Sequence, residues 1–272
     1  MNVFAPDYYK SFKCIADKCH HNCCIGWEID IDEETLEFYK TQKDLIGKIS
    51  LKDTPHFVQE SNGRCPFLND RNLCDIITNH GEDRLCQICR DHPRFRNFFE
   101  SRTEIGLGLT CEAAARLILD NDFSLEIIGT DDQSPIESQD ETEFFEFRNG
   151  VFKRSPESLK FTLPEIKIKD LAKVLKNLER LDSAWDEVLD SLKDRDLLLT
   201  DSEFKDPKKA KRLFDYFVFR HLHVWGLDFC ILCTFFIMYL DGDVYENARM
   251  FSSEIEYSDQ NIETLIQKVL DV

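Results

Sequence analysis

The stretch Cys14-Ile-Ala-Asp-Lys-Cys19-His-His-Asn-Cys23-Cys24-Ile-Gly-Trp27 places four cysteines and two histidines within eleven residues. Further cysteines follow at positions 65, 74, 86, 89 and 111, and the last two stand at 230 and 233. Nine of the eleven cysteines therefore lie in the first 111 residues. Thiols this dense bind a metal or a cluster, form disulfides or take part in redox chemistry.

The spacing of these cysteines indicates which classes of metal site are possible. Structural zinc typically uses two C-x2-C or C-x2-H pairs, and only Cys86-Gln-Ile-Cys89 has that spacing. Radical S-adenosylmethionine (SAM) enzymes use C-x3-C-x2-C, and here Gly26 occupies the third place after Cys19 and Cys23. Iron–sulfur clusters accept irregular spacings with thiolates from distant segments. The sequence predicts a metal or cluster site without deciding the metal.

Eight cysteines are the candidate ligands, more than the four that one cluster needs, so some are structural or bind a second metal. The first choices are Cys19, Cys23, Cys24 and Cys89, and the others are Cys14, Cys65, Cys74 and Cys111. His20, His21 and His92 are either further ligands or exposed side chains. The apolar surroundings of Cys230 and Cys233 predict two core residues.

Composition limits the possible partners and the compartment. The 272 residues carry a formal net charge of -18, which disfavours nucleic acid and suits a partner that presents lysine or arginine. The N-terminus has no secretory signal pattern. The apolar run 224–240 is interrupted by Asp228 and predicts a buried helix rather than a membrane span. We therefore expect a cytoplasmic protein with reduced thiols and no disulfides.

The expected fold is mainly α with a few short strands. We expect a cysteine-rich metal or cluster domain at 1–130, an acidic linker at 131–150 and a helical domain at 151–272. Short strands are expected at 27–32, 64–68, 73–77, 105–110 and 123–128. Helices are expected behind the caps Asp32 and Ser258, and at 112–120, 171–192, 207–223, 225–239 and 245–256.

Several phrases together resemble the flagellin lysine-N-methylase family, FliB, and the wider group of zinc- or iron-chelating cysteine domains. In the N-terminal part they are Phe12-Lys-Cys14, Cys19-x3-Cys23-Cys24-x2-Trp27, Ile29-Asp-Ile-Asp32, Cys65-Pro-Phe-Leu68, Leu73-Cys74-x-Ile76, Gly81-Glu82, Cys89-Arg-x2-Pro93-Arg94 and Thr110-Cys111-Glu112-Ala113-Ala114. In the C-terminal part they are Leu178-x2-Leu181-Asp-x2-Trp185, Tyr216-x3-Arg220 and Ser252-x-Glu254-Ile-Glu-Tyr257-Ser258. Two departures are a short segment around 150–170 and the missing proline after Cys111.

This resemblance implies methyl transfer from SAM to lysine side chains of flagellin or another lysine-rich protein, with a 4Fe-4S cluster. Trp27 and Arg94, both in the matched phrases, are the implied cofactor contacts. Arg94, like Arg90 and Arg96, either pairs with surface carboxylates or binds a substrate carboxylate in fork geometry. The candidate bases are Glu254, Glu256 and Tyr257, unless these residues only pack at a helix end. The alternative is a non-enzymatic iron- or zinc-binding protein.

Overall fold

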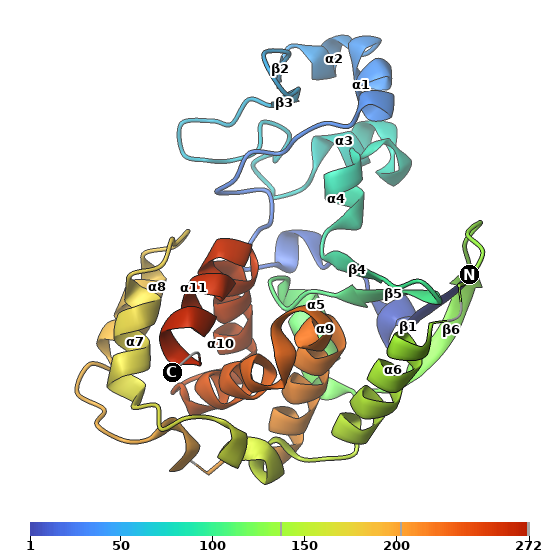
Figure 1. Cartoon of the computed structure of the whole chain (residues 1–272). Helices are drawn as coiled ribbons and strands as arrows, with labels where there is room; N and C mark the ends of the chain where they lie inside the picture. The colour runs from blue at the N-terminus through green and yellow to red at the C-terminus, as the bar shows by residue number, and fades with distance from the viewer. Residues whose placement is uncertain (137, 202, 271–272) are drawn as a thin grey trace. The chain divides into compact units, whose positions relative to one another are not determined.

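The computed structural model describes residues 1–136, 138–201 and 203–270 (Figure 1). It divides into two compact units, and each is described by itself. The larger unit contains residues 1–12 and 95–272, and the smaller unit contains residues 13–94. The smaller unit is thus an insertion after the first twelve residues of the larger one. As expected, the described chain is mainly helical with a few short strands.

The boundary lies elsewhere than the acidic linker expected at 131–150, because this segment is bonded to the larger unit. The terminal ammonium of Met1 donates to Asp131 Oδ1 at 2.9 Å. The carboxylate of Glu141 accepts the backbone N–H groups of Glu100 and Ser101 at 2.5 and 3.0 Å. A segment bonded to the larger unit at Asp131 and at Glu141 does not act as a free linker.

The larger unit begins with a four-stranded sheet in the order β4-β5-β1-β6 (Figure 1). Its strands are β1 (Asn2–Pro6), β4 (Arg94–Phe98), β5 (Arg102–Leu107) and β6 (Leu125–Thr130). Strand β1 runs parallel to β5 and antiparallel to β6, with Asn2 opposite Arg102 and Phe4 opposite Ile127. The strands expected at 105–110 and 123–128 overlap β5 and β6, whereas β1 and β4 were not predicted.

Helices form the rest of the larger unit (Figure 1). They are α5 (Glu112–Asp120), α6 (Gln139–Phe152), α7 (Ile168–Lys176), α8 (Ala184–Asp190), α9 (Pro207–Tyr239), α10 (Val244–Phe251) and α11 (Asp259–Val269). The helix expected at 171–192 is in fact two helices, α7 and α8. The Ser258 side chain caps α11 by accepting the N–H of Asn261, as predicted.

Helix α9 forms the centre of this core. It joins the helices expected at 207–223 and 225–239 across a bend at Gly226, where φ is +81°. Phe217, Phe229 and Phe235 are fully buried on it, and Trp185 of α8 packs edge-on against Phe236. On length and apolar composition alone α9 also meets the criterion for a membrane-crossing helix, a test that core helices of soluble proteins pass as well.

The smaller unit has its own apolar core. Its elements are α1 (Glu33–Lys40), α2 (Lys43–Ile46), β2 (Ile49–Ser50), β3 (His56–Phe57), α3 (Asp75–His80) and α4 (Gln87–Asp91). The rings of Tyr39, Phe57 and Phe67 pack at its centre, with 6.0 and 5.0 Å between successive ring centroids. The Asp32 side chain caps α1 through the N–H of Thr35, as predicted.

Two expected strand features of the smaller unit are wrong. The segment 27–32 makes only a single bridge, between Asp30 and His56. The expected hairpin of 64–68 with 73–77 is reduced to one bridge between Leu68 and Cys74, after which α3 begins. The second of these segments carries Cys65 and Cys74 on irregular backbone rather than on paired strands.

Candidate functional site

The Cys23–Cys24 loop is fixed by backbone hydrogen bonds to the loop that carries Cys65. The N–H of Cys65 donates to the carbonyl of Cys24 at 2.8 Å, and the N–H of Gly26 donates to Gly63 O at 2.9 Å. Gly26 has φ +95°, a left-handed conformation that glycine adopts at little cost. The two hydrogen bonds hold the Cys24 backbone beside that of Cys65.

Trp27 holds the Cys23–Cys24 loop through two hydrogen bonds. Its indole Nε1–H donates to the carbonyl oxygen of Cys23 at 2.7 Å, and its own carbonyl accepts from the Gln59 amide. The side chain remains 37% exposed. Its observed contacts thus position the Cys23 backbone, and its predicted contact with a cofactor stays a prediction.

Two more cysteines stand at the N-terminal caps of short helices. Cys74 precedes α3, and Cys86 precedes α4. The α4 start is held by Asp32, whose Oδ2 accepts the N–H of Gln87 at 2.7 Å while Oδ1 caps α1 at Thr35. One carboxylate thereby links the two helices and sets the position of Cys86.

Six thiols of the smaller unit lie near enough to one another to change each other's ionisation. They are Cys23, Cys24, Cys65, Cys74, Cys86 and Cys89, and we call them the thiol cluster. The pKa of Cys24 is raised by its hydrogen bond to Cys23, by burial and by the charges of Cys65 and Cys74. The pKa of Cys89 is raised by its hydrogen bond to Cys86, by burial and by the charges of Cys86, Cys24 and Cys65.

Within the thiol cluster the cysteines form two hydrogen-bonded pairs. The Cys24 thiol donates to Cys23, and this bond, with one to His92, lowers the pKa of Cys23 against the effect of burial. The Cys89 thiol likewise lowers the pKa of Cys86. In each pair one thiol thus stabilises the ionised form of its partner. A thiolate is the form of cysteine that binds metals and attacks electrophiles.

The donor chemistry of the thiol cluster fits a thiolate-bound metal, since sulfur ligands select zinc and iron–sulfur clusters. Its side-chain positions do not yet form a coordination shell. Across residues 1–136, 138–201 and 203–270, no three Cys, His, Asp or Glu side chains converge closely enough to hold an ion. None of the eleven cysteines is joined in a disulfide.

The remaining predicted site residues lie in different places. Cys14 and Cys19 belong to the smaller unit, where Cys14 Sγ accepts from Ala16 N at 3.4 Å and Cys19 Sγ donates to His21 O at 3.1 Å. Cys111 belongs to the larger unit, at the N-terminal cap of α5. Arg94, at the start of β4, donates from Nη1 to the carbonyl of Arg90 at 2.9 Å.

Cys86 is a member of the thiol cluster that the choice of candidate ligands left out. The C-x2-C spacing to Cys89 was the signal that pointed to it. On a short helix, residues three apart face the same side, so this spacing brings the two thiols together. The structure has the two within hydrogen-bonding reach.

The larger unit contains a buried polar network around Glu256. Glu256 ends a π-helical turn, Ser252–Glu256, that continues α10. Its carboxylate accepts from Tyr216 OH at 3.0 Å and from His221 Nε2 at 2.5 Å, with Arg220 Nη1 at 3.3 Å. Burial opposes ionisation, but the charge of Arg220 and the bond from His221 outweigh it and lower the pKa of Glu256 to about 2.

The three candidate bases therefore have different surroundings. Glu256 is ionised and held by three side chains, while Tyr257 is 40% exposed. Glu254 is buried, and its carboxylate accepts the backbone N–H groups of Leu181 and Asp182 at 2.9 and 3.0 Å. These contacts give Glu254 a structural role, and whether Glu256 or Tyr257 acts as a base stays a prediction.

Sequence comparison finds relatives over part of the chain. A flagellar biosynthetic protein FliU from Salmonella muenchen is 26% identical over 135 residues, covering 45% of this chain and 80% of FliU. Lysine-N-methylases from Salmonella typhimurium and Salmonella choleraesuis are each 26% identical over 135 residues. The match spans 45% of this chain but only about a third of those enzymes, 34%. No family model and no solved structure matches.

The residues quoted for the FliB resemblance are dispersed over both units. Tyr216, Arg220 and Glu256, from two of those phrases, meet in one buried network. The vicinal cysteines and Cys65, from two others, meet in the thiol cluster. Over 45% of its length this chain is similar to FliU and to the lysine-N-methylases.

Proposed function

We propose that this protein is a methyltransferase that transfers a methyl group from SAM to lysine side chains of flagellin or a similar lysine-bearing protein. The observation that carries the proposal is the similarity to proteins named lysine-N-methylase, together with a flagellar protein. The acidic chain, with a net charge of -18, supports the choice of a cationic protein substrate.

The reaction forms a bond between the lysine nitrogen and the methyl carbon and breaks the bond from that carbon to sulfur. S-adenosylhomocysteine leaves, and the ammonium proton of lysine passes to a base. An amine attacks only when it is neutral, so a nearby acceptor is required. Of the two candidate acceptors, Tyr257 is the more accessible, because Glu256 is buried and already bonded by Tyr216 and His221.

The thiol cluster is the proposed holder of an iron–sulfur cluster. Cys23 and Cys86, whose pKa values are lowered, would supply the first thiolates, and the metal would displace the protons of Cys24, Cys65 and Cys89. An iron with fewer than four protein ligands would bind the amino and carboxylate groups of SAM. Trp27, which fastens the Cys23 loop, would keep this wall of the site in place.

Anaerobic reconstitution of the full chain with iron and sulfide, followed by titration with SAM and assay on flagellin, tests the proposal. We expect a brown protein that binds SAM and transfers labelled methyl groups to lysine. Cys24→Ser should lose the bound iron, whereas Cys233→Ala, in the apolar core of the other unit, should retain it. If the cluster-loaded protein does not bind SAM, the proposed methyltransferase function is refuted.

A second candidate is an iron- or zinc-binding protein without catalysis. The observation that favours it is the thiol cluster itself, six cysteines in an 82-residue unit, since such a site needs no methyl donor. A colourless protein with stoichiometric zinc and no affinity for SAM would support this function. Zinc content that falls in Cys24→Ser but not in Cys233→Ala would place the zinc in the thiol cluster.

A further inference from the structure

The start of α9 is the most basic part of an otherwise acidic chain. Five of the eight residues from Lys205 to Arg212 are lysine or arginine, although acidic residues outnumber basic ones by 52 to 34 overall. Pro207 occupies the first turn and Asp206 caps it through the N–H of Lys209. Such a run is commonly a solvated face, so its surroundings decide whether it forms a site.

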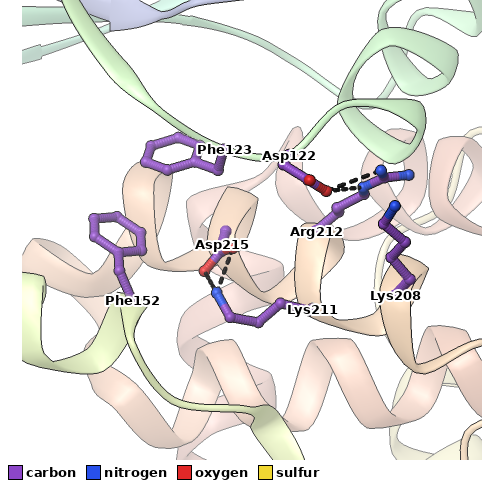
Figure 2. A pocket seen from close by; sticks show the side chains of 7 residues that line it. All are labelled: Asp122, Phe123, Phe152, Lys208, Lys211, Arg212 and Asp215. Carbon is purple, nitrogen blue, oxygen red and sulfur yellow. Dashed lines mark hydrogen bonds and ion pairs between the residues drawn. The ribbon is translucent and has the colours of Figure 1, made fainter.

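Part of this basic stretch lines a pocket of about 230 Å³ in the larger unit (Figure 2). Lys208, Lys211 and Arg212 come from the first two turns of α9. The ammonium of Lys208 and the guanidinium of Arg212 lie at the same end of the pocket in Figure 2. This arrangement concentrates positive charge in a hollow and not along an open helix face.

The carboxylates of the pocket compensate only two of these three cations. Arg212 pairs with Asp122 at 2.9 Å, and Lys211 pairs with both oxygens of Asp215. Lys208 has no acidic partner within ion-pair distance in the part of the chain that the structure describes. The Asp122 side chain is 78% exposed, so a more highly charged anion can displace it from Arg212.

The opposite wall of the pocket is aromatic. Phe123, just before β6, and Phe152, at the end of α6, stack with 4.8 Å between ring centroids and 30° between ring planes. Both rings lie to one side of Asp215 in Figure 2, away from Lys208. A ligand that fits this pocket has an anionic end for the cations and a flat apolar end for the rings.

We propose that this pocket binds a small phosphate monoester whose phosphate contacts Lys208 and Arg212 and whose apolar group lies against Phe123 and Phe152. A phosphate carries nearly two negative charges and three acceptor oxygens, which suits several convergent cations. The volume is below the 300–1,000 Å³ usual for drug-sized ligands, which favours a small ester over a complete nucleotide. The site is separate from the proposed methyl transfer.

Calorimetric titration of the full chain with phenyl phosphate tests the proposal, because this probe carries both required parts. We expect saturable 1:1 binding that weakens with added salt, weaker binding of inorganic phosphate, and none of phenol. Lys208→Gln should lower the affinity roughly tenfold, the expected effect of one charge-assisted hydrogen bond. The exposed Lys208 makes no ion pair in the described chain, so its loss should not disturb folding.

Lys209→Gln is the matched control, because Lys209 is the next residue on α9 and lies over the Tyr245 ring at 4.3 Å, outside the pocket lining. It should bind phenyl phosphate as the unchanged protein does. Phe152→Leu should weaken the binding of phenyl phosphate and leave that of inorganic phosphate unaltered. Absence of saturable binding at low salt, or equal losses in Lys208→Gln and Lys209→Gln, would overturn the proposal.

Discussion

Replacing Arg148 with methionine breaks a fully buried ion pair between helix α6 and strand β5. The guanidinium donates to both oxygens of Glu104, from Nη1 at 2.8 Å and from Nη2 at 2.6 Å, and neither side chain is more than 1% exposed. Arg102 contributes a second contact to Glu104 at 2.6 Å. The rings of Phe145 and Phe219 lie beside the Arg148 guanidinium, so water is excluded from this pair.

Removal of one partner from a buried pair typically costs about 3–5 kcal/mol, because the other charge is left without compensation. Glu104 would keep Arg102, so we expect the lower half of this range for Arg148→Met. For a unit of this size that corresponds to a fall in melting temperature on the order of 10 °C. The measurement is thermal and urea unfolding of the full chain followed by circular dichroism.

A double-mutant cycle measures the coupling free energy between Arg148 and Glu104. Glu104→Met should cost at least as much as Arg148→Met, because it leaves two guanidinium groups without a carboxylate. The double variant should be less destabilised than the sum of the single variants, by about 0.5–3 kcal/mol. Lys167→Met, which breaks an exposed ion pair with Asp196, is the control and should change stability little. Additive losses, or Arg148→Met as stable as the control, would refute the argument.

Three further predictions concern other buried or strained positions. Glu256→Gln should be less stable than the unchanged protein at pH 7. Since the pKa of Glu256 is lowered to about 2, its ionisation stabilises the fold above about pH 4.5, and this stabilisation is lost as the pH falls through 2. The stability deficit of the variant, measured by urea unfolding, should therefore shrink in acid, and a pH-independent deficit would contradict the assignment. Gly226→Ala should destabilise by about 1 kcal/mol, because φ +81° strains an L side chain, and unchanged or higher stability in the same assay would be inconsistent with that strain. Asn261→Ala should cost about 2–4 kcal/mol, because the buried amide donates to Glu179 O and Glu254 O at 2.8 and 2.9 Å, and a loss under 1 kcal/mol would show that water replaces these bonds.

The features that the sequence predicted correctly depend on neighbouring residues. Asp32 and Ser258 cap α1 and α11 because each side chain reaches an N–H three residues along the chain. Pro207 begins α9 because its fixed φ suits the first turn of a helix. The Cys86–Cys89 spacing brings two thiols together for the same local reason, although Cys86 was not among the predicted ligands.

The features that were missed depend on distant partners. The hairpin expected at 64–68 and 73–77 became a single bridge followed by α3, so alternation of residue types was a weak guide there. The segment expected to form one helix at 171–192 forms two, with a break at 177–183. The hydrophobic period continues through this break, and for that reason the pattern predicted a single helix. Strand β1 is only five residues long, and its pairing with β5 and β6 joins segments about a hundred residues apart.

The sequence by itself determined which chemistry is available: a dense set of thiols, an acidic surface and the phrases that link the chain to FliU and the lysine-N-methylases. The tertiary structure alone decided which of these residues meet. Six thiols from four separate stretches gather because the Cys24 and Cys65 backbones bond and Asp32 fixes the start of α4. Glu256 becomes ionised in the core because the π-helical turn places it against Arg220 and His221, contacts that no local spacing specifies.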